Sequence, residues 1–148
     1  MEKKSQLFQK ATSFCAYQER CLSEIKEKLY EWEASQEESE AIINQLIKEK
    51  YIDEERFAKT YAGSKFRTKK WGRLKIKFML KQKNISTTLI NKGLQEINAE
   101  EYYETLKTLA LQKKEALRNK FDKGKLYNYL ISKGFESDLV QEVIREIE

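Results

Sequence analysis

Residues 72–97 read GRLKIKFMLKQKNISTTLINKGLQEI and residues 122–147 read DKGKLYNYLISKGFESDLVQEVIREI, two stretches that repeat one pattern 50 positions apart. Periodicity alone aligns any two amphipathic helices. Here the residues that end a helix coincide as well, since Asn84 falls on Gly134, and this coincidence favours a true repeat. The apolar positions match without a gap: Ile76 with Leu126, Leu80 with Leu130, Ile85 with Phe135, Leu89 with Leu139, Ile90 with Val140, Leu94 with Ile144 and Ile97 with Ile147.

An earlier stretch carries the same pattern with a different loop length between its helices. Its apolar residues match those of residues 72–97 at two offsets. Ile25 and Leu29 match Ile76 and Leu80 at an offset of 51, and Ile42, Ile43 and Ile47 match Leu89, Ile90 and Leu94 at an offset of 47. The sequence therefore predicts an all-α fold of three tandem three-helix repeats, similar to helix-turn-helix domains. We expect the repeats at residues 1–50, 51–97 and 98–148, in an elongated, curved molecule, because units in series make few contacts between first and third.

Helical signals cover nearly the whole chain. No proline interrupts it, and apolar residues recur at spacings of three and four. Asp53, Ser86 and Asp122 stand where an N-cap belongs, because their side-chain oxygens can accept from the free N–H groups of a first helical turn. The expected helices span Ser5–Tyr17, Leu22–Glu33, Glu37–Glu49, Glu54–Lys69, Arg73–Lys83, Thr87–Ile97, Ala99–Asn119, Lys123–Lys133 and Ser137–Ile147.

The composition excludes several kinds of catalytic site. The 148 residues include no histidine, so a Ser-His-Asp triad, an imidazole base and a histidine-containing zinc site are ruled out. Neither of the glycine-rich patterns G-x-x-x-x-G-K-[ST] and G-x-G-x-x-G occurs, so no phosphate-binding loop of these kinds is expected. Paired acids such as Glu37 and Glu38 fall in first helical turns, where the helix dipole favours them. We therefore expect neither an enzyme nor a cofactor.

The two cysteines, Cys15 and Cys21, are too few to complete a tetrahedral zinc site. No apolar run approaches the about 20 residues that cross a bilayer, and the N-terminus does not open a signal peptide. These features predict a cytoplasmic protein with reduced thiols. A disulfide across the turn between the first two helices is possible, but we favour a buried, inert Cys15.

Charge is unevenly distributed along the chain. Residues 1–55 carry a net charge of −5 and residues 96–148 a net charge of −2. Residues 56–95 hold 12 basic residues and no acidic residue. Because like charges repel along a helix, a segment of one sign loses stability and is typical of a surface that binds a polyanion or an acidic protein groove. An incidental basic surface is the alternative.

A row of cations follows one flank of the expected helix Arg73–Lys83. Ile76, Met79 and Leu80 form its inward stripe. Such a row can contact phosphates or carboxylates without reading bases. The candidate binding residues are those of this row and of the preceding helix and corner: Lys65, Arg67, Lys69, Lys70, Arg73, Lys77 and Lys81.

Apolar residues interleave with these cations. Leu74 and Phe78 lie away from the inward stripe, and we expect them to pack on a neighbouring repeat, with contact to a partner as the alternative. Tyr61, Phe66 and Trp71 could stack on nucleic-acid bases. Core packing is the simpler interpretation, in which Phe57 pairs with Tyr61 and Trp71 fills the corner between two helices.

Two local strings resemble the RecX family of recombinase regulators. Residues 50–58 read KYIDEERFA and residues 70–76 read KWGRLKI, similar to the family pattern G-[YF]-[IL]-[DN]-[DE]-x-R-[FY]-A followed by [KR]-x-G-x-x-[KR]-[IL]. Residues 20–29 are similar to the first-repeat pattern R-S-x-x-E-L-x-x-K-L. The resemblance covers about residues 11–147. Two positions depart from it: Lys50 replaces a common glycine, which suggests a different helix ending, and Cys21 replaces a capping serine, which suggests a looser helix start.

The resemblance implies a protein that lies in the groove of a RecA–DNA filament and negatively regulates RecA. We expect this protein to be a monomer. Inhibition of strand exchange and ATPase, and direct binding of single- and double-stranded DNA, belong to that implication, whereas a membrane does not. Two alternatives remain open. One is a stand-alone helix-turn-helix DNA-binding protein such as a transcription factor, and the other is a helical-repeat scaffold for an acidic protein.

Overall fold

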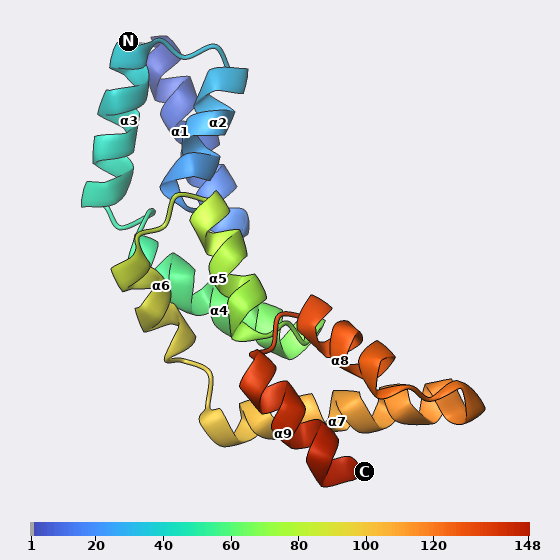
Figure 1. The fold of residues 1–148 in the computed structure, drawn as a ribbon. Coiled ribbons are helices and arrows are strands. Elements are labelled where there is room, and N and C mark those ends of the chain that lie inside the picture. Colours follow the sequence, from blue (N-terminus) through green and yellow to red (C-terminus); the bar gives the residue numbers. More distant parts are fainter. Residues whose placement is uncertain (1) are drawn as a thin grey trace.

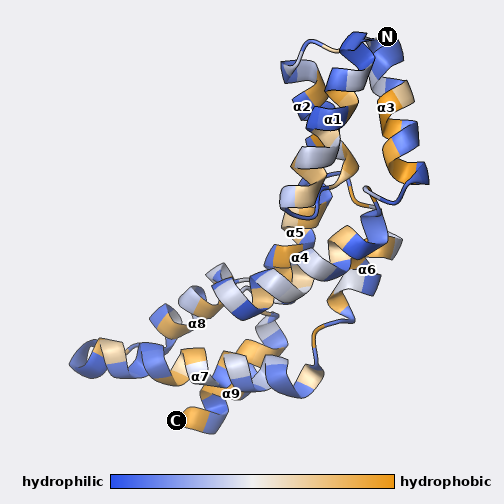
Figure 2. Ribbon diagram, turned by 180° about the vertical axis from the view of Figure 1, so that it is seen from behind, coloured by the Kyte–Doolittle hydropathy of each residue, from blue (hydrophilic) through white to orange (hydrophobic). Residues whose placement is uncertain are grey.

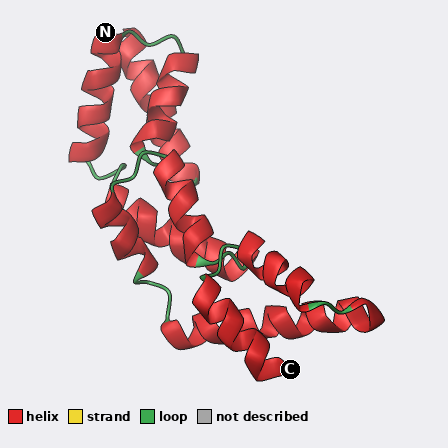
Figure 3. Ribbon diagram, viewed as in Figure 1, coloured by secondary structure: helices red, strands yellow, loops and turns green. Residues whose placement is uncertain are grey.

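The computed structural model describes residues 2–148, and within them every regular element is helical (Figures 1 and 3). The molecule is elongated and curved, with the two chain ends at opposite ends (Figure 1). The expected all-α repeat fold is confirmed. The helices are α1 (Glu2–Tyr17), α2 (Leu22–Glu31), α3 (Gln36–Lys48), α4 (Glu54–Lys69), α5 (Arg73–Gln82), α6 (Thr87–Leu94), α7 (Ala99–Leu117), the short 3₁₀ helix η1 (Arg118–Lys120), α8 (Lys123–Ser132) and α9 (Ser137–Ile147).

Helix starts follow the predicted caps. The side chains of Asp53, Ser86 and Asp122 accept hydrogen bonds from backbone N–H groups of the first turns of α4, α6 and α8. The largest differences from the expected bounds are three residues each: α1 begins at Glu2 instead of Ser5, and α6 ends at Leu94 instead of Ile97. The last expected turn of α6 is a tight turn in which Ile97 N–H donates to the Leu94 carbonyl, because the chain leaves here for α7.

The three repeats share one turn between their second and third helices. Ala34, Ile85 and Phe135 each donate a backbone hydrogen bond to the leucine five residues earlier: Leu29, Leu80 and Leu130. The residue before each donor is left-handed, with φ of 59° at Glu33, 63° at Asn84 and 99° at Gly134. This pattern is a Schellman-type helix ending, and it repeats where the sequence pattern repeats.

The different helix ending expected at Lys50 is wrong, and the looser helix start expected at Cys21 stays a prediction. Lys50 adopts the left-handed conformation that a glycine would supply, with φ of 63°, and Tyr51 N–H donates to the Leu46 carbonyl, so this helix ending is the ordinary one. The start of α2 is closed by Glu24, whose Oε1 accepts from the Cys21 N–H at 3.0 Å. The carboxylate half of the capping box therefore does not depend on a serine.

Helices pack mainly within their own triplet, and their hydrophobic positions face each other there (Figure 2). Helices α1–α3 enclose one core, which includes Ile52 after α3. Helices α4–α9 share a second, continuous core, to which Cys21 also contributes. The predicted repeat limits after residues 50 and 97 stay a prediction.

The second and third triplets are joined through the backbone. Gly72 N–H donates to the Lys133 carbonyl at 2.8 Å, and Leu74 N–H donates to the Gly134 carbonyl at 2.9 Å. A Cβ on Gly72 would lie 2.3 Å from the Gly134 carbonyl carbon and oxygen, so only glycine permits this approach. The Tyr102 ring adds an aromatic contact, with its centroid 5.8 Å from Phe66 and 5.1 Å from Phe135.

The first and second triplets are joined differently, largely by charged side chains. Arg56 Nε donates to Glu19 Oε1 at 2.9 Å, and Lys83 Nζ donates to Glu24 Oε2 at 3.1 Å. Buried Cys21 packs here as well. The expectation that Cys15 is the buried thiol is wrong, because Cys15 is only half-buried; both thiols are free.

Candidate nucleic-acid interface

The cations of the acid-free segment fall into two groups. One group pairs with carboxylates that lie outside the segment on either side of it. Arg56 pairs with Glu19, Lys59 with Glu55 and Glu96, Arg73 with Glu136, Lys83 with Glu24, and Lys92 with Glu55. These pairs hold helices and repeats together, so their charge is largely neutralised at the surface.

The other group has no ion-pair partner among residues 2–148, and we call it the cationic surface. It runs from the last turns of α4, through the corner after Lys69, to the last turn of α5. Helix α4 ends at this corner, and its C-terminal dipole favours nearby cations. Lys70 caps α4 in the left-handed conformation, with φ of 57°. The members are Lys65, Arg67, Lys69, Lys70, Lys75, Lys77 and Lys81.

Six of the seven sequence-predicted residues have no ion-pair partner among residues 2–148, whereas Arg73 pairs with Glu136, and the predicted binding role of all seven stays a prediction. Arg73 Nη1 donates to Glu136 Oε2 at 2.8 Å, and its guanidinium carbon lies 3.8 Å from the centroid of the Tyr102 ring. The Arg73 backbone N–H also donates to the Tyr102 hydroxyl, which in turn donates to Glu136. The side chain is 29% exposed. Arg73 therefore joins the second triplet to the third.

Burial and the hydrogen bond to Glu136 raise the pKa of Tyr102 far above its ordinary value, although the backbone N–H of Arg73 acts in the opposite direction. This shift favours the protonated hydroxyl, which donates to Glu136.

Sequence reasoning missed Lys75 and Lys133. Lys75 belongs to the acid-free segment, but it does not share the i,i+4 spacing of Arg73, Lys77 and Lys81 and so lies outside their row. Lys133 lies in the third repeat, and its Nζ donates to the Lys69 carbonyl at 2.9 Å. Burial, then the nearby charges of Lys75 and Lys69, lower the pKa of Lys133. An anion placed among these three ammonium groups would relieve their repulsion.

The interleaved aromatic residues divide between core and surface. Phe66 is buried and stacks on Tyr102, so it is a core residue. Phe57 is buried and stacks on Tyr61 at a centroid distance of 5.7 Å, as the core interpretation predicted. Tyr61 and Trp71 are only half-buried, and Lys65 Nζ lies 5.4 Å and 5.3 Å from their ring centroids.

The expectation that Leu74 and Phe78 pack on a neighbouring repeat is wrong. Leu74 is 51% exposed and Phe78 is 60% exposed, one turn apart on the outer face of α5. The adjacent third repeat approaches α5 through Gly72 and Lys75 and leaves this outer face uncovered. The two residues add an apolar strip beside Lys77 and Lys81.

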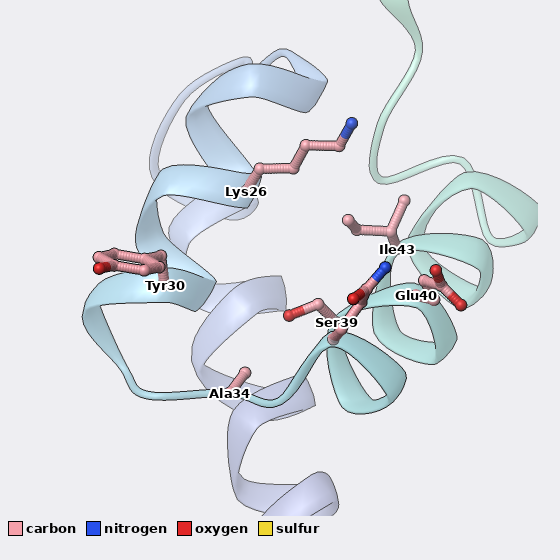
Figure 4. A pocket seen from close by; sticks show the side chains of 7 residues that line it. Lys26, Tyr30, Ala34, Ser39, Glu40 and Ile43 are labelled. Atoms are coloured by element: carbon pink, nitrogen blue, oxygen red, sulfur yellow. The ribbon is translucent and has the colours of Figure 1, made fainter.

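Other surface features fit a polyanion less well. A cavity of about 410 Å³ lies between α2 and α3, where Lys26 reaches toward its opening and Tyr30 points away from α3 (Figure 4). It holds one cation, Lys26, and one carboxylate, Glu40, within the acid-rich first repeat. The described part of the chain contains no cluster of three metal-ligating side chains. Within residues 2–148, no helix is long and apolar enough to span a membrane.

Comparison with known protein families gives the second and third triplets an identity. Residues 53–94 match the family model for the second three-helix domain of RecX, and residues 100–144 match that for its third three-helix domain. This chain belongs to the RecX family. RecX is a family of regulatory proteins, and the cationic surface lies within its second three-helix domain.

Similar proteins support the RecX assignment over most of the chain. The regulatory protein RecX of Clostridium acetobutylicum is 32% identical over 145 residues, which cover 93% of this chain and 67% of that protein. The regulatory protein RecX of Lactobacillus gasseri is 29% identical over 150 residues, which cover 99% of this chain and 55% of that protein. This chain thus spans between about half and two thirds of the length of these relatives.

A solved RecX structure shows the same arrangement of helices. The crystal structure of RecX from Lactobacillus salivarius aligns with a TM-score of 0.86 and 25% identity, over 98% of this chain and 96% of that one. The curved arrangement of three triplets is therefore a RecX fold.

Proposed function

We propose that this RecX-family chain is a negative regulator of RecA. In this proposal it binds as a monomer in the groove of the RecA–DNA filament in the cytoplasm, inhibits RecA ATPase and strand exchange, and contacts single- and double-stranded DNA directly. Family membership supports the regulatory role. The observation that carries the proposal is the cationic surface, because its ammonium and guanidinium groups lack carboxylate partners in the part of the chain that the structure describes.

The shape of the molecule supports a groove rather than a single DNA site. Three small repeats in series form a curved body (Figure 1). The middle repeat contains the segment of residues 56–95, which holds 12 basic residues and no acidic residue. A long, narrow groove contacts such a body along its length, whereas a compact reader of base edges uses one recognition helix. Lys-rich contacts to phosphates carry little sequence information, which suits a filament formed on any DNA.

The binding residues that we propose are Lys65, Arg67, Lys69, Lys70, Lys75, Lys77 and Lys81, with Lys133 at their edge. Arg73 is left out because Glu136 already holds its guanidinium. The direct contacts are to phosphate or carboxylate oxygens, since ammonium and guanidinium groups donate charge-assisted hydrogen bonds to both.

The decisive experiment titrates this protein into a RecA ATPase assay on single-stranded DNA. We expect ATP hydrolysis and strand exchange to fall at or below equimolar protein. Unchanged ATPase at a salt concentration where co-sedimentation shows the protein bound to the filament would refute the regulatory proposal.

A charge variant tests the surface itself. Replacing Lys69, Lys77 and Lys81 together with Gln removes three unpaired cations without disturbing an ion pair of the fold. If each cation contacts one phosphate, the plot of log affinity against log salt flattens by about 2 units on single-stranded DNA and by about 3 units on duplex DNA.

The matched control replaces Lys48, Lys120 and Lys125, which are exposed and lie outside the cationic surface, with Gln. It removes the same charge, so equal losses from both triple variants would show that net charge alone governs binding. Loss of filament binding with unchanged binding to bare DNA would assign the three cations to RecA carboxylates.

A further inference from the structure

A second cavity lies at the junction of the first and second repeats, next to the cationic surface. It measures about 390 Å³, within the range of small-molecule sites. Residues of α4 and α5 form most of its wall, and the turn between α1 and α2 closes one side. The lining residues that matter here are Tyr61, Ser64, Lys65, Trp71, Met79 and Lys83.

We propose that this cavity accepts one unstacked nucleobase, whose adjoining phosphate is bound by Lys65. The inference deepens the proposed function, since it rests on direct contact with nucleic acid. It adds a selectivity for single strands, because a base in a duplex is stacked and paired and cannot enter a side cavity without being unstacked and unpaired.

The aromatic walls supply the stacking surface. The Tyr61 and Trp71 centroids are 6.4 Å apart and their planes are inclined by 57°, so the two rings diverge rather than stack on each other. Phe57 supports Tyr61 from the core, with ring centroids 5.7 Å apart and planes inclined by 30°. The rings are thus held at an angle and half-exposed, which leaves aromatic surface for a base.

Lys65 occupies the place that the base would take and can move from it. Its Nζ lies 5.3 Å from the Trp71 centroid and 5.4 Å from the Tyr61 centroid. Its contacts are weak, because a cation–π contact at an exposed site is worth less than a stacked base. A base that displaces the ammonium group from the rings leaves it free to meet the phosphate of the same nucleotide.

The remaining polar groups tolerate a phosphate and offer little base recognition. The carboxylates of Glu19 and Glu24 border the cavity, but Arg56 and Lys83 neutralise them at 2.9 Å and 3.1 Å. Ser64 can hydrogen-bond a base edge as donor or acceptor, so it accommodates any base. We therefore expect binding of a single strand with little sequence preference.

The adjoining cations favour a strand over a free nucleotide. Lys65 lines the cavity, and Lys69 and Lys70 follow on the end of α4, so the phosphates beyond the bound base have further cations to contact. A free nucleotide offers only its own phosphate. The shared chemistry is a nucleobase with one phosphate, and the experiment below separates the two sources.

The chain contains two tryptophans, Trp32 and Trp71, and this gives a direct probe. Trp32→Phe leaves Trp71 as the single fluorophore, and Trp71→Phe leaves Trp32, which packs on Phe14 in the first core. We would titrate both proteins with oligothymidylate, with a duplex of equal length, and with thymidine monophosphate, and follow binding independently by anisotropy of labelled DNA.

Oligothymidylate is expected to quench Trp71 and not Trp32, whereas the duplex binds without quenching Trp71. Unchanged Trp71 fluorescence at saturating oligothymidylate overturns the inference. Saturable quenching by thymidine monophosphate at the concentration at which oligothymidylate acts overturns the assignment to a strand. RecA ATPase is read separately: quenching without inhibition sinks the proposed function alone, and inhibition without quenching sinks this inference alone.

Affinity measurements complete the test. Trp71→Leu is expected to weaken oligothymidylate binding by about 5- to 150-fold, the range for loss of one stacked base, and to leave duplex affinity within about two-fold. Trp71→Phe keeps an aromatic ring and should retain most of the affinity. Lys65→Gln removes no core contact and should weaken single-strand binding, so it decides the matter if Trp71→Leu does not fold. Wild-type affinity in both variants contradicts the inference.

Discussion

Replacing Gly72 with Ala tests whether the close backbone approach of the second and third repeats holds the curved molecule together. Gly72 precedes α5 with φ of −76°, a conformation that alanine adopts freely, so the substitution adds no backbone strain of its own. Its effect is steric, because the new Cβ would lie 2.3 Å from the Gly134 carbonyl and 2.4 Å from the Phe135 nitrogen. Backbone atoms cannot turn aside as the end of a flexible side chain can.

The expected loss in the free energy of unfolding follows from the contacts that the new Cβ would disturb. Overpacking a well-packed contact costs about 1–3 kcal/mol. If the two backbone segments move apart, the hydrogen bonds from Gly72 to Lys133 and from Leu74 to Gly134 also lengthen, and each of them is worth about 0.5–1.5 kcal/mol. We expect Gly72→Ala to lower the free energy of unfolding by about 2–6 kcal/mol in urea denaturation followed by circular dichroism, and to weaken filament binding.

Gly124→Ala is the matched control. Gly124 is exposed in the first turn of α8, and a Cβ there meets only the Asp122 side-chain oxygen, at 3.0 Å. Alanine is the better helix former by up to about 1 kcal/mol, so this variant should be as stable as the wild type or more stable. A Gly72→Ala protein within about 0.5 kcal/mol of the wild type would refute the argument for the junction.

Three further predictions concern titration, thiols and shape. Burial raises the pKa of Glu54, whose Oε2 atom is buried without a hydrogen-bond partner among residues 2–148. The protonated carboxyl therefore favours the folded state, and this contribution to the free energy of unfolding is lost as the pH rises through the raised pKa. Urea denaturation should therefore favour Glu54→Gln increasingly from about pH 4 to about pH 7, and a difference independent of pH would contradict this. Ellman's reagent should modify half-buried Cys15 before Cys21, because burial of Cys21 is complete; equal rates would show that the junction of the first two repeats opens readily. Small-angle scattering should give a radius of gyration well above the about 15 Å of a globular chain of this length, and a value near it would rule out the elongated shape.

The helices and their ends could be predicted from the sequence because they depend on neighbours in the chain. The caps at Asp53, Ser86 and Asp122 and the left-handed residues at Asn84 and Gly134 are set by side chains and backbone within one turn. The repeat follows from the same local pattern. The left-handed conformations of Glu33 and Lys50 could not be predicted in this way, because glutamate and lysine, unlike glycine and asparagine, do not favour that conformation.

The site was predicted only in part because surface charge is decided by tertiary pairing. Arg73, Lys77 and Lys81 form one row on a helical projection, yet Glu136 lies 63 residues from Arg73 in sequence and removes it from the row. The exposed positions of Leu74 and Phe78 depend in the same way on where the third repeat docks. Periodicity within one helix contains none of this information.

The charge segregation along the chain serves the fold as well as the surface. Arg56 and Lys83 reach acids of the first repeat, Lys59 reaches Glu96 before the third, and Arg73 reaches Glu136 within it. Apart from Glu55, which pairs with Lys59 and Lys92, this middle segment has no local acid that would compete for its cations, so Arg56, Lys83 and Arg73 are available to acids of the neighbouring repeats. The same absence leaves the remaining cations unpaired at the α4–α5 corner, at least against residues 2–148. Adding a single acid to the segment, for example by Lys77→Glu, should therefore weaken polyanion binding by more than the loss of one cation, because the new carboxylate also pairs with Lys81 one turn away.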